Sequence, residues 1–259
     1  MTKSLSRIHA VAANTFREAI RNKLLYMLLG FSIGLIGAGV LLASLSYVQV
    51  SEILQDVGMA AIRLFGAGIA IFIGAGLVHN EVDRRTIYTI LSKPVSRGEF
   101  LVGKWAGLTV TVWLQLLLMA AAFVAVSKVS GAPVRVEHGA AIALVGLELM
   151  VLIAIATFFS CVTTPMLASF YTFGLWLIGH LSRDLYVLGQ QSEQASIPRV
   201  TGWLYAVLPD FEVFNKTLEA VYGLPIRGDE VGFAVLYASG YSVVTLVIAS
   251  AIFARRDLK

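Results

Sequence analysis

Residues 140–162 read AAIALVGLELMVLIAIATFFSCV, and Glu148 is the one charged side chain among them. A helix needs ~20 mostly apolar residues to cross the ~30 Å hydrocarbon core of a bilayer. It must also satisfy its own backbone hydrogen bonds, because lipid offers no partners for them. This stretch therefore predicts a helix that spans a membrane.

Five other stretches have the same character, and we expect an all-α integral membrane protein with six transmembrane helices. The expected spans are residues 24–45, 57–78, 105–126, 140–162, 165–181 and 231–253. The fifth span is the shortest, but Thr164 and Pro165 predict a defined start for it, as a cap residue followed by proline at the first helical position. We treat residues 1–259 as a single transmembrane domain.

The composition agrees with a membrane protein. Of the 259 residues, 58% are hydrophobic and 14% are charged, and the mean hydropathy is +0.79. Soluble domains carry ~25% charged residues. The net charge of +4 comes from basic residues beside apolar runs, so we expect membrane lipid and no nucleic acid as a partner. The single cysteine, Cys161, excludes an intrachain disulfide and a cysteine cluster for metal.

The basic residues also predict the orientation in the membrane. Lys and Arg are concentrated in residues 1–23, in the connection 79–104 and after residue 254. The other connections carry few, and those in the long connection 182–230 count for less, because long loops cross the membrane largely regardless of charge. An even number of spans puts these three segments on one side, and cytoplasmic loops carry the excess of Lys and Arg. We therefore expect a multi-pass protein of the inner (cytoplasmic) membrane with both termini in the cytoplasm.

Residues 1–23 precede the first span and show an amphipathic pattern. Apolar residues recur at helical spacing, while Arg7, Arg17 and Arg21 fall elsewhere on the helical wheel. The apolar positions are Leu5, Ile8, Ala12, Phe16 and Ala19. This pattern predicts an elbow helix that lies in the membrane interface, with a plain solvated leader as the alternative.

The connection between the second and third spans, residues 79–104, reads HNEVDRRTIYTILSKPVSRGEFLVGK. Asn80 can cap a short helix that Pro94 ends. The apolar positions of this helix lie on one face, and they are Ile87, Ile90 and Leu91. The connection therefore predicts a short amphipathic helix held between two rigid turns.

Directly after this short helix, Ser96 and Glu99 have the spacing of a capping box, just before an apolar run that starts at Phe100. The short helix is thus fixed to two membrane spans at once. An element of this kind can receive a push from a cytoplasmic partner and pass it to both spans. The same composition also fits a purely structural turn.

This connection resembles the signature region of ABC-2-type permeases, in which an acidic residue precedes Arg-Arg-Thr, a short helix, Ser-Lys-Pro-Val-Ser-Arg and a Gly-Lys pair. The matching positions are Glu81, Arg84, Arg85, Thr86, Ser92, Lys93, Pro94, Val95, Ser96, Arg97, Gly103 and Lys104. Residues 14–19 are similar to the N-terminal elbow of that family, and residues 253–257 to its usual ending. Residues 208–212 resemble the outer connection of the subgroup called multi-copper-enzyme-maturation permeases.

The resemblance implies a coupling helix that docks onto a separate ABC ATPase subunit, in a transporter with two permease copies and two ATPases. The implied ATPase-coupling residues are Glu81, Arg84, Arg85, Thr86, Ile87, Ile90, Leu91, Lys93, Pro94 and Arg97. The chain has no phosphate loop of the form G-x-x-x-x-G-K-[ST]. We therefore expect no enzyme activity, cofactor or metal in this chain, with ATP and Mg²⁺ bound by the partner.

Two charged residues, Arg63 and Glu148, fall inside expected spans, where an ion costs ~2.5 to 3.5 kcal/mol on insertion scales. At ~1.5 Å rise per residue, each lies ~9 to 12 Å from the outer end of its span, so their depths match. We hypothesise an ion pair between the second and fourth spans. The alternatives are a substrate or proton site and two unpaired side chains that face water. Charge reversal at each position and then at both tests the pairing.

Two smaller features of the spans lead to structural expectations. His79 and His180 lie at span ends without metal-ligand spacing, so we expect solvated side chains. Gly30 and Gly34 form a GxxxG pair, which allows close helix contact. We expect that contact within the protomer, with a seam between two copies as the alternative.

The outer connection, residues 182–230, becomes rich in aromatic residues and proline in its second half. Amphipathic rings of this kind favour a membrane interface. The resemblance implies a short re-entrant hairpin that gates the exit path on the outer side. The gate residues that we expect are Trp203, Pro209, Asp210, Phe211 and Phe214.

The sequence supports three functional hypotheses. The first is the transmembrane permease subunit of an ATP-driven ABC exporter, a homodimer or heterodimer of such chains. The second is a mechanotransmission subunit that passes ATP-driven motion to a periplasmic partner protein. The third is an ion-coupled secondary transporter that uses Arg63 and Glu148 as a relay and works without ATP. The apolar lining leaves the substrate open.

Overall fold

The computed structural model describes residues 2–46, 49–76, 96–192, 194 and 196–255, and every regular element in these ranges is a helix. The helices are α1 (Thr2–Ala19), α2 (Lys23–Ala43), α3 (Val50–Ala75), α6 (Arg97–Val129), α7 (Val136–Val162), α8 (Pro165–Gln190), α9 (Ser196–Val207), the 3-10 helix η1 (Phe211–Phe214), α10 (Thr217–Tyr222) and α11 (Gly228–Arg255). The all-α expectation is confirmed for this part of the chain.

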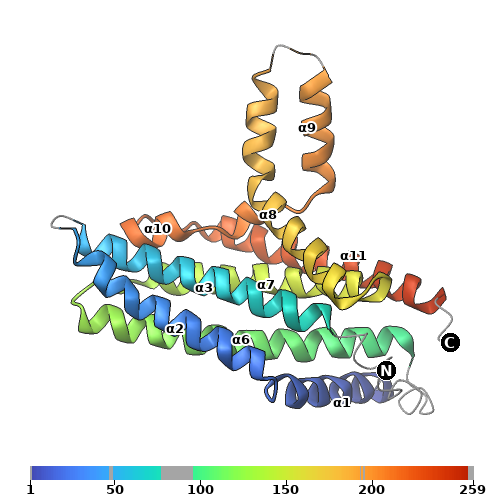
Figure 1. The fold of residues 1–259 in the computed structure, drawn as a ribbon. Helices are drawn as coiled ribbons and strands as arrows, with labels where there is room; N and C mark the ends of the chain where they lie inside the picture. The colour runs from blue at the N-terminus through green and yellow to red at the C-terminus, as the bar shows by residue number, and fades with distance from the viewer. Residues whose placement is uncertain (1, 47–48, 77–95, 193, 195, 256–259) are drawn as a thin grey trace.

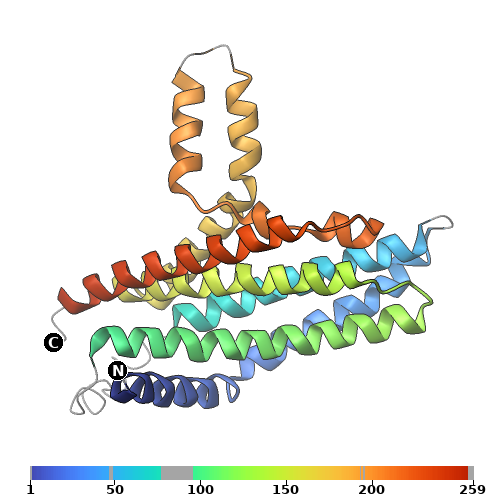
Figure 2. The same cartoon turned by 180° about the vertical axis from the view of Figure 1, so that it is seen from behind.

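The long helices run side by side and form an elongated bundle (Figure 1). α1 packs against α6, and both ends of the chain lie at the same end of the bundle, which we call the terminal end (Figures 1 and 2). α8 starts within the bundle, but its C-terminal half leaves it and pairs with α9. This α8–α9 hairpin projects away from the other helices, and we call it the side arm.

Five helices in the described part of the chain are long and apolar enough to cross a membrane, namely α2, α3, α6, α7 and α11. They match the expected spans except the fifth. α8 is not among them, because its apolar part, residues 165–181, is short and is followed by Ser182, Arg183 and Asp184. α8 does begin at Pro165 as expected, although Thr164 makes no side-chain cap bond. The count of six spans stays a prediction.

α7 is the central helix of the bundle. It packs against α3, α6, α8 and α11, and every residue from 151 to 157 is buried. The side chains on all faces of this segment are apolar or small, as expected for a helix that is covered all round. Glu148 lies just before this segment and is fully buried with it. The stretch 140–162, which predicts a membrane span, therefore also places an acidic side chain in the core.

α6 begins where the sequence predicts. The Glu99 N–H donates to Ser96 Oγ (3.2 Å), and the Ser96 N–H donates to Glu99 Oε2 (3.0 Å), so the expected capping box is confirmed. Two glycines then let α1 approach α6 closely. A Cβ at Gly103 would lie 2.9 Å from the Ile8 carbonyl oxygen, and one at Gly107 would lie 2.5 Å from another backbone oxygen of α1. The leader is therefore a helix that packs on α6, and its place in the membrane interface stays a prediction.

The glycine face of α2 does not pack within the protomer. A Cβ at Gly30, Gly34 or Gly37 would meet no atom within 4 Å among the described residues. The three positions are exposed on the bundle. The expected close contact within the protomer is therefore wrong for Gly30 and Gly34, because no helix in the described part of the chain lies over this face of α2.

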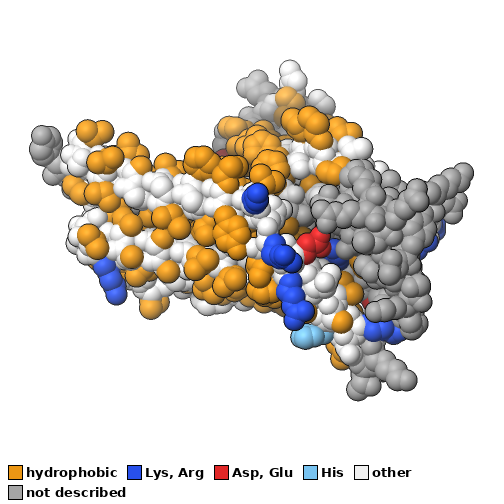
Figure 3. All heavy atoms as spheres, turned by 60° about the horizontal axis from the view of Figure 1, so that its bottom comes forward, with side chains coloured by type: hydrophobic (Ala, Val, Ile, Leu, Met, Phe, Trp, Pro, Cys, Tyr) orange, Lys and Arg blue, Asp and Glu red, His pale blue; other side chains and the backbone are white. Residues whose placement is uncertain are grey.

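Figure 3 shows the side of the molecule that is the underside of Figure 1. Apolar side chains spread along the bundle, whereas most of the Lys and Arg side chains on this face gather toward the terminal end. An apolar band with basic residues near one end is the pattern of a protein that lies in lipid. The surface thus agrees with the five apolar helices beneath it.

Candidate functional site

The two charged residues of the expected spans lie together in the bundle. Arg63 Nε on α3 is 3.3 Å from Glu148 Oε2 on α7. The Arg63 side chain is 15% exposed and that of Glu148 is fully buried. The contact is an ion pair without hydrogen-bond alignment, because neither atom has a hydrogen-bond partner in the described part of the chain. The structure thus brings together the two residues for which the sequence suggests a pair.

Two residues of α8 complete the surroundings of Glu148. Trp176 donates its Nε1–H to Glu148 Oε1 over 2.8 Å, and His180 Nε2 lies 3.0 Å from the same oxygen. The two rings meet edge to face, with centroids 5.1 Å apart. Trp176 and His180 are four residues apart, so they share one face of α8. Glu148 is therefore compensated by groups from α3 and α8, as a buried carboxylate requires.

His180 also reaches the segment that follows α9. Its Nδ1 lies 3.3 Å from Glu212 Oε1 in η1. A neutral imidazole donates through one nitrogen only, whereas both nitrogens of His180 face carboxylate oxygens. The geometry therefore favours the doubly protonated, cationic ring. Two cations and two carboxylates then balance, and we call Arg63, Glu148, His180 and Glu212 the charge network.

Glu212 is fixed by further bonds in its own loop. Asn215 Nδ2 donates to both carboxylate oxygens, at 3.2 and 3.1 Å. The hydrogen bond from His180, helped by that from Asn215, holds the pKa of Glu212 below its ordinary value despite partial burial. Arg63 Nη2 also donates to the Phe214 carbonyl oxygen over 3.4 Å. The network thereby ties η1 to α3, α7 and α8.

Four of the five expected gate residues lie against the bundle. Pro209, Asp210, Phe211 and Phe214 are buried, and both phenylalanine side chains are fully enclosed. Trp203 is separate from them, since it lies on α9 and is 66% exposed. The structure therefore joins residues 209–214 to the charge network and leaves Trp203 on the side arm.

Asp210 connects the side arm to the bundle. Its carboxylate accepts hydrogen bonds from the Glu212 N–H (3.0 Å) and from the Tyr205 hydroxyl of α9 (2.9 Å). Its own N–H donates to Tyr237 Oη of α11 (2.8 Å). Burial, with the bond to Asp210, raises the pKa of Tyr205, which keeps this hydroxyl a donor. Asp210 thus links α9, η1 and α11 through hydrogen bonds.

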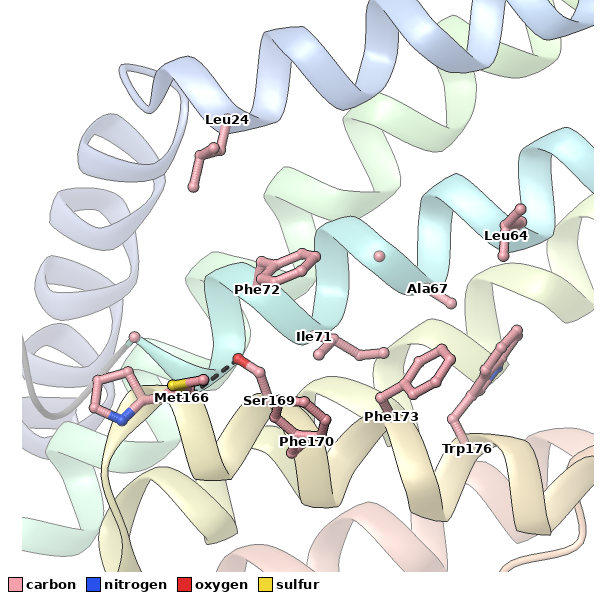
Figure 4. Close-up of a pocket in the computed structure, with 13 residues that line it drawn as sticks. Leu24, Leu64, Ala67, Ile71, Phe72, Met166, Ser169, Phe170, Phe173 and Trp176 are labelled. Atoms are coloured by element: carbon pink, nitrogen blue, oxygen red, sulfur yellow. Dashed lines mark hydrogen bonds between the residues drawn. The ribbon is translucent and has the colours of Figure 1, made fainter.

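A groove runs between α3 and α8 beside the charge network. Its larger part is a cavity of about 720 Å³ lined almost wholly by apolar side chains of α2, α3 and α8. Figure 4 shows Phe173 and Trp176 reaching from α8 toward α3, which carries Ile71 and Phe72. Ser169 faces this cavity too, but its hydroxyl donates to the backbone oxygen of Pro165 (2.9 Å). This part of the groove is therefore suited to apolar groups.

A second cavity, of about 410 Å³, adjoins the first, because Leu64 and Trp176 line both. Its walls are mixed, because Asp56, Arg63 and Asn215 lie among apolar lining residues. We call the two cavities together the α3–α8 groove. The groove is apolar in one part and carries polar and charged side chains among apolar ones where it meets the charge network.

Most of the implied ATPase-coupling residues lie outside the described residues. These are Glu81, Arg84, Arg85, Thr86, Ile87, Ile90, Leu91, Lys93 and Pro94. Arg97 is described, and its Nη1 donates to the carbonyl oxygens of Phe253 (2.6 Å) and Ala254 (3.1 Å) at the end of α11. Glu99 pairs with Arg7 of α1 at 2.9 Å. The first turn of α6 is thus bonded to both α1 and α11.

The chemistry of the charge network is that of an ion-pair lock. Among the residues that the structure describes, no group of three or more His, Cys, Asp or Glu side chains could hold a metal ion. Each carboxylate of the network already faces a cation. Such a closed set of charges can hold η1 against the helices, and separating its members requires several kcal/mol.

The sequence-based prediction did not place His180 and Glu212 in this network. The expectation of a solvated His180 is wrong, because the side chain is only 15% exposed and contacts two carboxylates. The spacing of Trp176 and His180 on one face of an apolar helix is the signal that points inward. Glu212 and Asn215 carry no such signal, since their places depend on how the long segment after α8 returns to the bundle.

A comparison over nearly the whole chain identifies its family. Residues 9–258 match the family model described as ABC-2 family transporter protein. The chain belongs to the ABC-2 transporter family. An ABC-2 permease is the membrane component of an ABC transporter and is not itself the ATPase. No curated protein matches the chain, and membership of the multi-copper-enzyme-maturation subgroup stays a prediction.

Proposed function

We propose that this chain is the permease subunit of an ATP-driven exporter and that a separate ATPase subunit moves it from the cytoplasmic side. Family membership supports a membrane component that pairs with an ABC ATPase. In this proposal the chain crosses the inner membrane six times, with α8 as the fifth span, and the terminal end of the bundle faces the cytoplasm. ATP and Mg²⁺ bind to the partner.

The observation that carries the proposal is the bonding of the first turn of α6. Arg97 joins this turn to the last carbonyls of α11, and Glu99 joins it to Arg7 of α1. The proposed coupling loop, residues 79–104, includes this turn. A displacement of the loop therefore acts on α1, α6 and α11 together, because rigid helices and short charged bonds transmit displacement.

The charge network supports a gate at the other end of this movement. Glu212 and the Phe214 carbonyl are the η1 partners of His180 and Arg63. These two contacts can break while Glu148 keeps its bond from Trp176. η1 can then leave the bundle while Glu148 stays compensated in the core. We propose this release as the opening step on the outer side.

The exposed glycine face of α2 supports a second copy of the permease. Gly30, Gly34 and Gly37 line one exposed face that no described residue covers. Small residues of this kind let two helices approach closely in a membrane. We propose that this face meets a partner permease, as the family resemblance implies.

Reconstitution tests the proposed function. The full chain with its ATPase, in proteoliposomes, is expected to move cargo only when ATP is hydrolysed. Arg97→Ala breaks the bond to α11, so ATP hydrolysis should continue while transport falls about tenfold or more. Arg227→Ala, at a 71% exposed side chain, is the matched control and should transport normally. Wild-type transport by Arg97→Ala contradicts the proposed route of coupling.

A second candidate is mechanotransmission to a periplasmic partner, and the side arm favours it. No residue of α9 is buried, and Trp203 presents a largely exposed indole. Exposed Trp residues are common anchors in protein interfaces. This candidate predicts a periplasmic protein that binds the complex stably and is lost with Trp203→Ala. Substrate-stimulated ATP hydrolysis with vesicle transport favours the exporter instead.

The third hypothesis, ion-coupled transport, also has one structural support. The charge network lines up four ionisable side chains from Arg63 to Glu212. It predicts uptake or efflux driven by an ion gradient in vesicles that contain this chain and no ATP. Absence of such transport removes this candidate.

A further inference from the structure

The α3–α8 groove has the shape of a site for a molecule with two unlike ends. Its apolar cavity extends along α3 from Leu64 to Gly76, which is ~18 Å at 1.5 Å per residue. Its smaller cavity, which has charged side chains in its lining, continues in the opposite direction along the same helix to Asp56. Leu64 and Trp176 line both cavities, so one ligand can occupy both.

The volume of the apolar cavity limits the size of that ligand. About 720 Å³ lies within the range of pockets that hold one drug-sized molecule. The walls are aromatic and aliphatic, with Phe72, Phe170 and Phe173 among them. A single alkyl chain is therefore a better fit than a two-chain bilayer lipid.

The charged side chains of the smaller cavity favour a positive head group. Arg63 is its one lining cation, and Glu148 already faces the guanidinium at 3.3 Å. Asp56 is exposed and has no ion pair with any described residue. Glu52 lies one turn before it on α3 and adds negative potential. The smaller cavity therefore offers an exposed acid, with no ion pair among the described residues, next to the apolar cavity, and Trp176 can add the face of its ring to a cation.

We propose that the α3–α8 groove binds a single-chain amphiphile with a cationic head group, its alkyl chain in the apolar cavity and its head beside Asp56. The inference that this ligand is also the transported cargo rests on the proposed function. Binding itself does not, because it requires only the groove of the full chain.

Photolabelling tests the binding site directly. The full chain in phosphatidylcholine nanodiscs is treated with dodecyltrimethylammonium that carries a diazirine in its alkyl chain, and with the matching dodecyl sulfate. The two-chain lipid is present in excess throughout. We expect the ammonium probe to label α3 and α8 around Phe72 and Phe170 in a saturable way. The sulfate probe should label these positions at least fivefold less.

Two substitutions separate the tail from the head. Gly68→Leu fills the apolar cavity, and its Cβ meets no described atom within 4 Å, so the fold accommodates it. It should reduce labelling tenfold or more, whereas Gly232→Leu, an equally open helical glycine outside the groove, should not. Asp56→Asn should weaken the ammonium probe about five- to tenfold and leave the sulfate probe unchanged, and Asp56→Glu should restore binding.

Three results overturn the proposal. One is equal labelling by both probes with no effect of Asp56→Asn, which shows an apolar slot without a head-group site. Another is labelling that stays intact in Gly68→Leu, and the third is labelling that maps to other helices. The experiment contains no ATPase. Failed ATP-driven transport with intact labelling therefore refutes the proposed function alone, and failed labelling with intact transport refutes this inference alone.

Discussion

Glu148→Gln removes the central charge of the network, and the structure sets the size of the effect. Glu148 is fully buried and faces Arg63 (3.3 Å) and His180 (3.0 Å), while Trp176 donates to it (2.8 Å). The glutamine keeps an acceptor for the indole but leaves the partly buried Arg63 guanidinium without its counter-charge. Removing one partner of a buried pair costs ~3 to 5 kcal/mol. At ~2 to 4 °C per kcal/mol, the unfolding midpoint should fall by about 6 to 20 °C.

The assay is thermal unfolding of the purified full chain in detergent, read by intrinsic fluorescence. Asp229→Asn is the matched control, because its partner Arg227 is 2.7 Å away and both side chains are more than 60% exposed, at 71% and 64%. An exposed pair contributes ~0 to 1 kcal/mol, so the control should shift the midpoint by less than about 4 °C. The comparison isolates burial, since both substitutions turn one carboxylate into an amide.

A double-mutant cycle decides whether the charges act as a pair. Arg63→Met with Glu148→Gln removes both charges, so the double variant should recover about 2 kcal/mol relative to the sum of the single losses. This cycle is cleaner than a charge swap, because an arginine at position 148 would face the donors of Trp176 and His180. Purely additive losses, or a Glu148→Gln midpoint within the range of the control, refute the network as a lock.

Three other outcomes follow from the same contacts. Gly107→Ala places a Cβ 2.5 Å from a backbone oxygen of α1 and should cost ~1 to 3 kcal/mol in unfolding measurements, whereas Gly240→Ala, with no described atom within 4 Å, should be neutral or stabilising. The pKa of Glu212 is lowered on folding, chiefly by His180, so its ionised form stabilises the fold above the ordinary value of ~4.3 and this gain is lost as pH falls through the lowered pKa. Unfolding midpoints taken from about pH 6 to pH 3 should therefore drop more in the wild type than in Glu212→Gln. Arg97→Lys keeps the charge but loses the planar guanidinium whose Nη1 donates to both carbonyls, and coupling assays should show an intermediate loss between wild type and Arg97→Ala.

Features that depend on local sequence were predictable. The capping box of Ser96 and Glu99 and the start of α8 at Pro165 need only neighbours in the chain. The contact of Arg63 with Glu148 is foreshadowed by depth, because the rise per residue of a helix is fixed and two spans of one membrane share their boundaries. The position of a residue along its span therefore predicts one dimension of the fold, which is the depth in the membrane.

Contacts that depend on how the segment after α8 packs back against the bundle were not predictable from the sequence. His180 looks like a span end because polar residues follow it, yet α8 continues to Gln190 and turns the imidazole inward. Glu212 meets it only after the side arm is complete. The prediction that the glycines of α2 pack within the protomer is wrong for a related reason. A GxxxG pattern shows that another helix can come close, but it does not show which helix does so.

The most direct test of the central claim is ATP-dependent transport by the complex isolated through this chain from its native membrane. We predict that an ABC ATPase is recovered with the permease and that vesicles move cargo only when ATP is hydrolysed. Replacing Arg84 and Arg85 in the coupling loop by alanine should abolish both recovery and transport. A chain that is recovered without an ATPase and moves its cargo on an ion gradient alone would contradict the account.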